Sequence, residues 1–159
     1  MIKFKGLFCA VVLLLSASVN AASYGYDSFL HDMAKGDIDF DTATVKCALM
    51  SGYTPSQAAH TRWSEVSTNE ITGTGYTAGG NTVAVTVTND TTNHRLTLTF
   101  PQTTWTNSTL SATRAVCYVS TGTGSTSPLI FQNDFGTTVT TSSGTFTLNA
   151  STIHINTAQ

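Results

Sequence analysis

The chain has 159 residues and a formal net charge of −2, and only 10% of its residues are charged, against about 25% in an average globular domain. Seven Lys and Arg stand against nine Asp and Glu, which excludes the basic field that draws a protein to nucleic acid. Hydrophobic residues make up 40% of the chain, so a domain of this size can bury a core of its own.

The N-terminal segment 1–21 has the layout of a secretory signal peptide. Lys3 and Lys5 precede an unbroken apolar run at 7–15, and small residues follow as far as a predicted cleavage after Ala21. The apolar run is shorter than the ~20 residues of a membrane span. Membrane contact is therefore expected only through this segment, and only if it stays uncleaved. The alternative is an uncleaved apolar arm that packs against a partner.

Residues 22–159 are expected to form one domain that begins with a short helix, Tyr26–Lys35. Asp27 or Ser28 can cap the start of this helix, and Gly36 can terminate it. Four apolar side chains at helical spacing share one face, which is predicted to cover a sheet: Phe29, Leu30, Met33 and Ala34.

The stretch Asp37–Asp41 follows the helix and alternates three aspartates with Ile38 and Phe40. Its spacing resembles the start of a calcium-binding loop. Thr42 and Ala48, however, stand where that loop needs a glycine and a bidentate glutamate. We expect a solvated edge with the two apolar side chains turned inward, and neither a metal site nor a cofactor.

Most of the remaining chain alternates apolar and polar residues, which is typical of half-buried strands. The clearest hairpin pairs Thr82–Thr88 with His94–Phe100 across the turn residues 89–93. About seven to nine short strands at roughly 8–12-residue spacing predict a mainly β fold, an antiparallel β-sandwich. The other strands are expected at Ala43–Met50, Ala112–Val119, Leu129–Phe135, Thr145–Leu148 and Thr152–Asn156.

Short segments between these strands are expected to supply helical turns and core aromatics. One or two helical turns are predicted near Ser56–His60. A further turn at Arg62–Val66 is expected to place Trp63 in the core, and the segment Gln102–Thr106 is expected to place Trp105 there.

Two cysteines, Cys47 and Cys117, lie in predicted strands with apolar neighbours. In an oxidising compartment they can pair and stabilise the fold by about 2–4 kcal/mol. The alternative is two buried thiols that never meet, because spacing alone does not fix connectivity. Zinc is not expected, since no second ligand pair stands at the spacing of a zinc finger.

Two glycine-rich loops are candidates for shaped surfaces that contact a partner. Glu70–Gly80 contains a Gly-x-Gly, but it does not open a helix after a strand and no Walker lysine follows, so nucleotide binding is not expected. Tyr118–Ile130 joins two predicted core strands; its glycines can take φ > 0, and its proline suits the first residue of a strand. The candidate interface residues are Gly73, Gly75, Tyr76, Gly79, Gly80, Gly122, Gly124 and Pro128.

The titratable residues form no catalytic motif that we can identify. A helix, a loop, a strand and a terminal strand are predicted to hold the four histidines: His31, His60, His94 and His154. The sequence contains no Gly-x-Ser-x-Gly nucleophile elbow. Glu65 and Glu70 lie close in sequence and could flank a cleft as in glycosidases, although two acids on a surface loop are far commoner. No enzymatic activity is expected, and a secreted hydrolase is kept as a third hypothesis.

Five features, in this order along the chain, resemble a family of small tailed-phage virion proteins. The last of them is the most specific. The features are Phe29–Leu30 with Gly36–Asp39, Thr44–Leu49 with Tyr53–Pro55, Trp63–Val66 with Glu70–Gly80, Trp105 with Ala115–Tyr118, and Thr121–Ile130.

The resemblance implies a β-sandwich of the virion without enzymatic activity, a capsid decoration or cement protein or a tail accessory protein. Its expected partners are the major capsid protein or tail components and further copies of itself, in a homo-oligomer or as repeated copies. The signal-peptide-like segment and the two strand cysteines depart from the family pattern and indicate an oxidising setting. The alternative is therefore an exported β-sandwich, a binding or filament-forming, adhesin-like subunit that is periplasmic or secreted.

Overall fold

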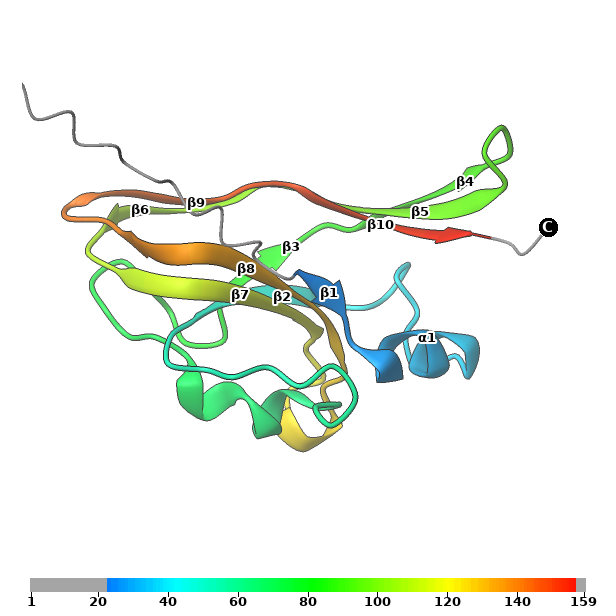
Figure 1. Cartoon of the computed structure of the whole chain (residues 1–159), viewed down its shortest axis with the longest axis horizontal. Coiled ribbons are helices and arrows are strands. Elements are labelled where there is room, and N and C mark those ends of the chain that lie inside the picture. Colours follow the sequence, from blue (N-terminus) through cyan, green and yellow to red (C-terminus); the bar gives the residue numbers. More distant parts are fainter. Residues whose placement is uncertain (1–22, 157–159) are drawn as a thin grey trace, which may run out of the picture.

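The computed structural model describes residues 23–156, and the predicted signal-peptide-like segment 1–21 lies outside the described residues. The described chain is mainly β, with ten strands in three sheets, and every strand pairing is antiparallel (Figure 1). One α-helix and three short 3-10 helices accompany the sheets. The predicted class, an antiparallel β fold with one short N-terminal helix, is confirmed, with ten strands where about seven to nine were expected.

The largest sheet has five strands in the order β1-β8-β7-β2-β3. Side chains are buried on both of its faces. This is seen in β2, where alternate residues belong to two separate core clusters. A strand covered on both sides reads as a nearly continuous apolar run. The strands are β1 (Tyr24–Gly25), β8 (Leu129–Thr140), β7 (Ser111–Val119), β2 (Val45–Met50) and β3 (Asn81–Val83).

Two smaller sheets form the second layer. One is three-stranded in the order β10-β5-β4, and the other pairs β6 with β9. Figure 1 shows them end to end above the five-stranded sheet, because β5 runs on into β6 and β9 runs on into β10. Their strands are β4 (Thr86–Asp90), β5 (Arg95–Phe100), β6 (Thr103–Ser108), β9 (Gly144–Leu148) and β10 (Ser151–Asn156).

The main core lies between the two layers and joins strands of all three sheets. Leu49 comes from the five-stranded sheet, Phe100 from the three-stranded sheet, and Trp105 from the two-stranded sheet. Trp105 is only 3% exposed and meets Phe146 with ring centroids 6.0 Å apart. Two packed layers of sheet with aromatic side chains between them are the sandwich-like arrangement that the sequence predicts.

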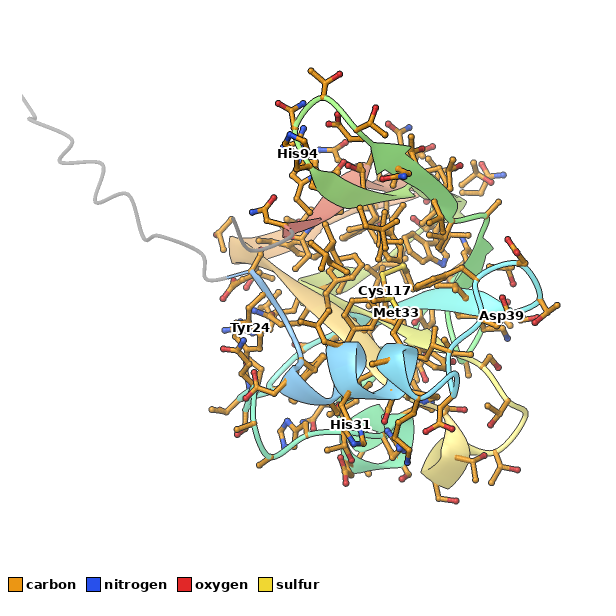
Figure 2. All side chains as sticks on the ribbon, turned by 90° about the vertical axis from the view of Figure 1, so that its right-hand side faces the viewer. Tyr24, His31, Met33, Asp39, His94 and Cys117 are labelled. Atoms are coloured by element: carbon orange, nitrogen blue, oxygen red, sulfur yellow. A yellow bond between two sulfur atoms is a disulfide. The ribbon has the colours of Figure 1, made fainter. Side chains whose placement is uncertain are left out.

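The helix α1 (Asp27–Ala34) lies within the predicted range and packs against β8. The predicted cap is wrong: Tyr26 occupies the N-cap position and makes no side-chain cap, and the Ser28 hydroxyl is buried without a partner among the described residues. The predicted apolar face is shifted as well. Leu30 is 48% exposed, because the buried side of the helix runs through Phe29 and the ion-paired Asp32. Figure 2 shows Met33 on the side of the helix that faces the sandwich and His31 on the opposite side.

The predicted strand Thr82–Thr88 is two strands in the structure. β3 ends at Val83 and pairs with β2, whereas β4 starts at Thr86 and pairs with β5. The two residues between them carry the chain from one layer to the other. The predicted hairpin of β4 and β5 does form, but its turn includes His94, which has a φ of 51° and does not lie in a strand.

The remaining elements follow the prediction with small differences. β8 extends beyond the predicted end at Phe135 to Thr140, because this polar stretch pairs with the start of β7, Thr140 lying opposite Ser111. The 3-10 helices are η1 (Trp63–Glu65), η2 (Ser67–Asn69) and η3 (Gly124–Thr126). In residues 23–156, no helix has the length and apolar character that crossing a membrane requires.

Candidate functional site

Residues 51–80, which we call the outer loop layer, cover the outer face of the five-stranded sheet with Tyr53, Trp63 and Val66 and then continue to the main core, where Tyr76 packs. The indole of Trp63 lies parallel to the ring of Tyr118 on β7, with centroids 4.2 Å apart and an angle of 4° between the planes. This pair belongs to a second core cluster that also includes Met50 and Val66. The prediction that Trp63 is a core residue is confirmed.

The first predicted loop, Glu70–Gly80, is held against β2 and β7 by one carboxylate and two tyrosines. Glu70 accepts hydrogen bonds from the Tyr76 hydroxyl at 2.7 Å and from the Gly79 N–H at 2.6 Å. The Tyr118 hydroxyl donates to the Gly79 carbonyl at 2.9 Å. Burial, then the electrostatic effect of Glu70, raises the pKa of Tyr118 to about 12, so this donor keeps its proton at any physiological pH.

Glycines in this loop are required by close packing within the chain. At Gly80, φ is +73° and an added Cβ would overlap the carbonyl oxygen of Cys47. At Gly73 an added Cβ would lie 2.6 Å from the carbonyl oxygen of Thr109. These glycines therefore let the loop lie flat on the sheets, while its exposed side presents Thr72, Thr74, Thr77 and Ala78.

The second predicted loop, at 120–128, is folded around the hydroxyl of Ser127. This hydroxyl donates to the carbonyl of Thr123 at 2.8 Å and accepts from the N–H of Thr121 at 3.1 Å. Gly122 has a φ of +86°, as predicted. The expectation for Gly124 is wrong, since it opens η3 with no positive φ and packs against Ser64.

The structure brings the two loops to the same stacked pair. The first loop reaches Tyr118 through Gly79. The second reaches Trp63, whose backbone N–H donates to the carbonyl of Ser127 at 2.9 Å. Pro128 directly precedes β8 and forms a bridge with Arg62. The candidate residues of the two loops thus form one continuous structure with η1, a grouping that sequence separation alone could not indicate.

A polar cluster that the sequence did not reveal links the outer loop layer to the start of α1. The hydroxyls of Tyr26 and Tyr53 are 2.7 Å apart, and the Tyr53 hydroxyl is 3.1 Å from Nδ1 of His60. A second link between α1 and the outer loop layer is the buried carboxylate of Asp32, which pairs with the Arg62 guanidinium at 2.5 Å. The only available signal was a lone histidine in a loop, which does not identify its partners.

The predicted turn near Ser56–His60 is one hydrogen-bonded turn and not a helix. The His60 N–H donates to the Ser56 carbonyl at 3.1 Å, and the Ser56 hydroxyl accepts from the Ala59 N–H at 3.3 Å. Ser56 therefore organises the turn from within.

The acidic side chains considered above serve the local structure around them. Glu65 accepts from the N–H groups of Thr61 and Arg62 at 2.6 and 2.9 Å, which caps η1. Asp39 accepts from the Asp41 N–H at 3.0 Å in a similar local turn. Within residues 23–156, no three His, Cys, Asp or Glu side chains gather in a way that could hold a metal ion.

The two cysteines occupy directly paired positions of β2 and β7 and are joined by a disulfide. Cys47 is 2% exposed and Cys117 is fully buried. Of the two alternatives that the sequence leaves open, the structure has the bonded one.

A second candidate surface is the three-stranded sheet, which extends past the five-stranded sheet above α1 (Figure 1). We call β4, β5 and β10 together the overhanging sheet. Its outward face carries the rows Thr86–Thr99–Thr152 and Thr88–Thr97–His154. Its inward face carries partly exposed apolar side chains that line hollows towards α1, namely Val87, Leu96, Ile153 and Ile155.

Comparison of the chain with protein-family models, with curated proteins and with solved structures finds no match. The outer loop layer and the overhanging sheet are therefore interpreted from their own residues.

Proposed function

We propose that the protein is a non-enzymatic structural protein of a phage virion, a capsid decoration or cement protein. It acts through contacts with capsid or tail proteins and with further copies of itself. The resemblance of its motifs to small tailed-phage virion proteins supports this proposal, and so does the surface of the overhanging sheet.

The observation that carries the proposal is the open, apolar underside of the overhanging sheet. Within residues 23–156, β4 and β10 each pair with β5 alone, so each has one edge of backbone N–H and C=O groups without a neighbouring strand. Val87 on β4 is 43% exposed and Leu30 on α1 is 48% exposed. Free sheet edges recruit strands of other chains, and exposed apolar side chains mark surfaces for protein contact.

The composition of this surface fits contact with another protein. The only charged residues of the overhanging sheet, Asp90 and Arg95, pair with each other at 3.0 Å near the tip of the hairpin. The rest of the sheet is threonine, serine, asparagine and aliphatic residues, with the buried Phe100 on β5 and one histidine on β10. Interface cores are depleted in charged side chains, so this sheet can be covered without leaving buried charges unpaired.

One observation favours the second candidate function, an exported binding or filament-forming subunit. A disulfide persists in an oxidising compartment such as the periplasm, and it is rare in the reducing cytoplasm. The bond between Cys47 and Cys117 therefore fits a protein that passes through a secretory pathway. The same overhanging sheet would then contact neighbouring subunits of an extracellular assembly.

Mass spectrometry of purified phage particles tests the first function. The proposal predicts the protein in the particle at a copy number comparable to that of a capsid or tail component. Its absence from purified particles contradicts the proposal. The second function predicts an exported product whose intact mass corresponds to a polypeptide that begins near Ala22 and contains the disulfide.

A further inference from the structure

The segment between β2 and η1 is closed by contacts to one imidazole nitrogen. Nδ1 of His60 lies 3.1 Å from the Tyr53 hydroxyl and 3.2 Å from the backbone nitrogen of Ser56. The His60 ring also stacks on the Tyr53 ring, with centroids 5.6 Å apart. Residues 53–60 therefore close on themselves around this nitrogen.

The Ser56 contact decides where the protons lie. A backbone N–H can only donate, so Nδ1 must offer its lone pair and carry no proton. The Tyr53 hydroxyl can then donate to the same nitrogen, and the Tyr26 hydroxyl can donate to the oxygen of Tyr53, 2.7 Å away. In a neutral His60 with its proton on Nε2, the Ser56 N–H and the Tyr53 hydroxyl share the single lone pair of Nδ1.

Protonation of Nδ1 is incompatible with this arrangement. The Tyr53 hydroxyl can turn and accept, but the Ser56 N–H would face another N–H and lose its acceptor. A polar group in a partly buried position that loses its partner is costly. Histidine is the side chain that ordinarily changes charge between pH 5 and 8, so this is the pH range in which the contact is to be tested.

The groups around His60 do not change charge over that range. Burial raises the pKa of both Tyr26 and Tyr53, so both hydroxyls keep their protons. Burial tends to raise the pKa of Glu65, but hydrogen bonds from the Thr61 and Arg62 backbone outweigh it and lower that pKa. The Glu65 carboxylate near His60 therefore stays ionised above pH 5 and favours an imidazolium.

The closed segment reaches the rest of the protein at the junction of β1 and α1. The Asp27 N–H donates to the Gln57 carbonyl at 3.2 Å, and the Gln57 side-chain amide donates to the Gly25 carbonyl at 3.0 Å. Beneath the segment lie the buried side chains of Tyr26 and Met50. Release of the segment would expose these two side chains.

We propose that His60 is an acid-sensitive clasp. Protonation of its Nδ1 opens the turn 56–60, frees residues 53–60 from the β1–α1 junction and uncovers the outer apolar cluster. This inference does not depend on the proposed virion function, because it rests on hydrogen bonds within one chain.

Amide hydrogen exchange on the full folded chain tests the clasp, with protection factors for Ser56 and Asp27 compared at pH 7.5 and pH 5. In the wild type, protection of both amides should fall about tenfold at pH 5, as expected for the loss of one hydrogen-bond partner. His60→Asn places a carbonyl acceptor near the position of Nδ1 without a group that titrates in this range, and its protection should not change with pH. His154→Asn, on the exposed face of β10, should behave like the wild type.

Unchanged protection of both amides in the wild type at pH 5 would overturn the proposal. An equal loss of protection in His60→Asn would overturn it too, because the loss would then come from another group. Imidazole nitrogen shifts in the wild type provide a test that needs no variant. The clasp requires the Nε2–H tautomer at pH 7.5, and a proton on Nδ1 at that pH contradicts it.

Discussion

At the scale of single residues, Trp105 shows how completely this fold encloses its largest side chains. Its indole lies between Tyr76 of the outer loop layer and Phe146 of β9, with ring centroids 5.9 and 6.0 Å away. Because only 3% of Trp105 is exposed, removing the indole leaves a cavity that the two layers cannot close. We expect Trp105→Ala to lower the free energy of unfolding by about 3–5 kcal/mol.

Urea unfolding measures this loss. Leu30→Ala is the control. Because this side chain is 48% exposed, its truncation should lower the free energy of unfolding by less than about 0.5 kcal/mol. A Trp105→Ala protein within about 1 kcal/mol of the wild type would show that Trp105 does not lie in the core.

Glu65 links stability to pH through its two backbone hydrogen bonds. Burial raises its pKa, but the bonds from Thr61 and Arg62 outweigh burial and hold the pKa below its usual value. A carboxylate whose pKa is depressed on folding contributes stability above its unfolded pKa, about 4.3, and loses that contribution as the pH falls through the folded pKa. Glu65→Gln should therefore be less stable than the wild type at pH 7, and the difference should shrink by pH 3.

Unfolding curves at both pH values compare the two proteins, and Glu70→Gln is a matched substitution in the same layer. A stability difference for Glu65→Gln that stays constant from pH 7 to pH 3 would show that the Glu65 carboxylate does not act as the cap of η1.

At the scale of elements, the glycines of the two loops meet two different requirements, a positive φ and close packing against a neighbouring backbone. Both Gly80 and Gly122 have positive φ, but only Gly80 packs against a backbone carbonyl, whereas nothing lies within 4 Å of a Cβ added at Gly122. Gly122→Ala should cost about 1 kcal/mol, the penalty of the left-handed conformation. Gly80→Ala should cost about 3 kcal/mol, because overlap with Cys47 is added to that penalty.

Thermal or urea unfolding of the two variants in parallel checks the difference. Equal losses of stability would mean that the first loop does not lie flat on β2.

The disulfide is an element-scale feature, since it joins two neighbouring strands of the five-stranded sheet across a sequence separation of 70 residues. Replacing Cys47 and Cys117 together by alanine should lower the free energy of unfolding by about 2–5 kcal/mol. Urea unfolding of the wild type with and without a reductant measures the same contribution. Two free thiols in the intact mass of protein purified from an oxidising compartment would contradict the structure.

Sequence reasoning predicted this fold where apolar alternation and turn residues agree, as in β2, β7 and the β4–β5 hairpin. It failed at residues 84–85, because the alternation continues while the chain changes sheets. It also missed the Tyr26, Tyr53 and His60 chain, since residues from separate segments meet only in three dimensions. The glycines of the first loop were predicted as candidate interface residues, and their packing against β2 and β6 depends on tertiary contacts that no local pattern encodes.

At the scale of the whole molecule, the protein has one closed side and one open side. The outer loop layer seals one face of the five-stranded sheet and is fixed by the stack of Trp63 on Tyr118. On the other side, the overhanging sheet extends beyond that sheet with two unpaired edges among the described residues. Such an asymmetry suits a protein that presents one surface to an assembly and another to solvent.

Two neighbouring residues of β4 distinguish the faces of the overhanging sheet. Val87 lies on the apolar underside and lines a hollow with Phe40 and Leu96. Thr88 is exposed in the threonine row of the opposite face. Both side chains reach solvent, so a lysine at either position adds the same charge with little cost to folding, and only the lysine at 87 would have to be desolvated in a contact through the underside.

The most direct test is to add the purified protein to phage particles that were assembled without it. Quantitative mass spectrometry of the sedimented particles then gives the occupancy. We predict that the wild type and Thr88→Lys bind to similar occupancy, whereas Val87→Lys binds at least about tenfold more weakly, as expected when a charge is buried in an apolar contact. Failure of the wild type to bind, or equal binding by Val87→Lys and Thr88→Lys, would contradict a structural role exerted through the overhanging sheet.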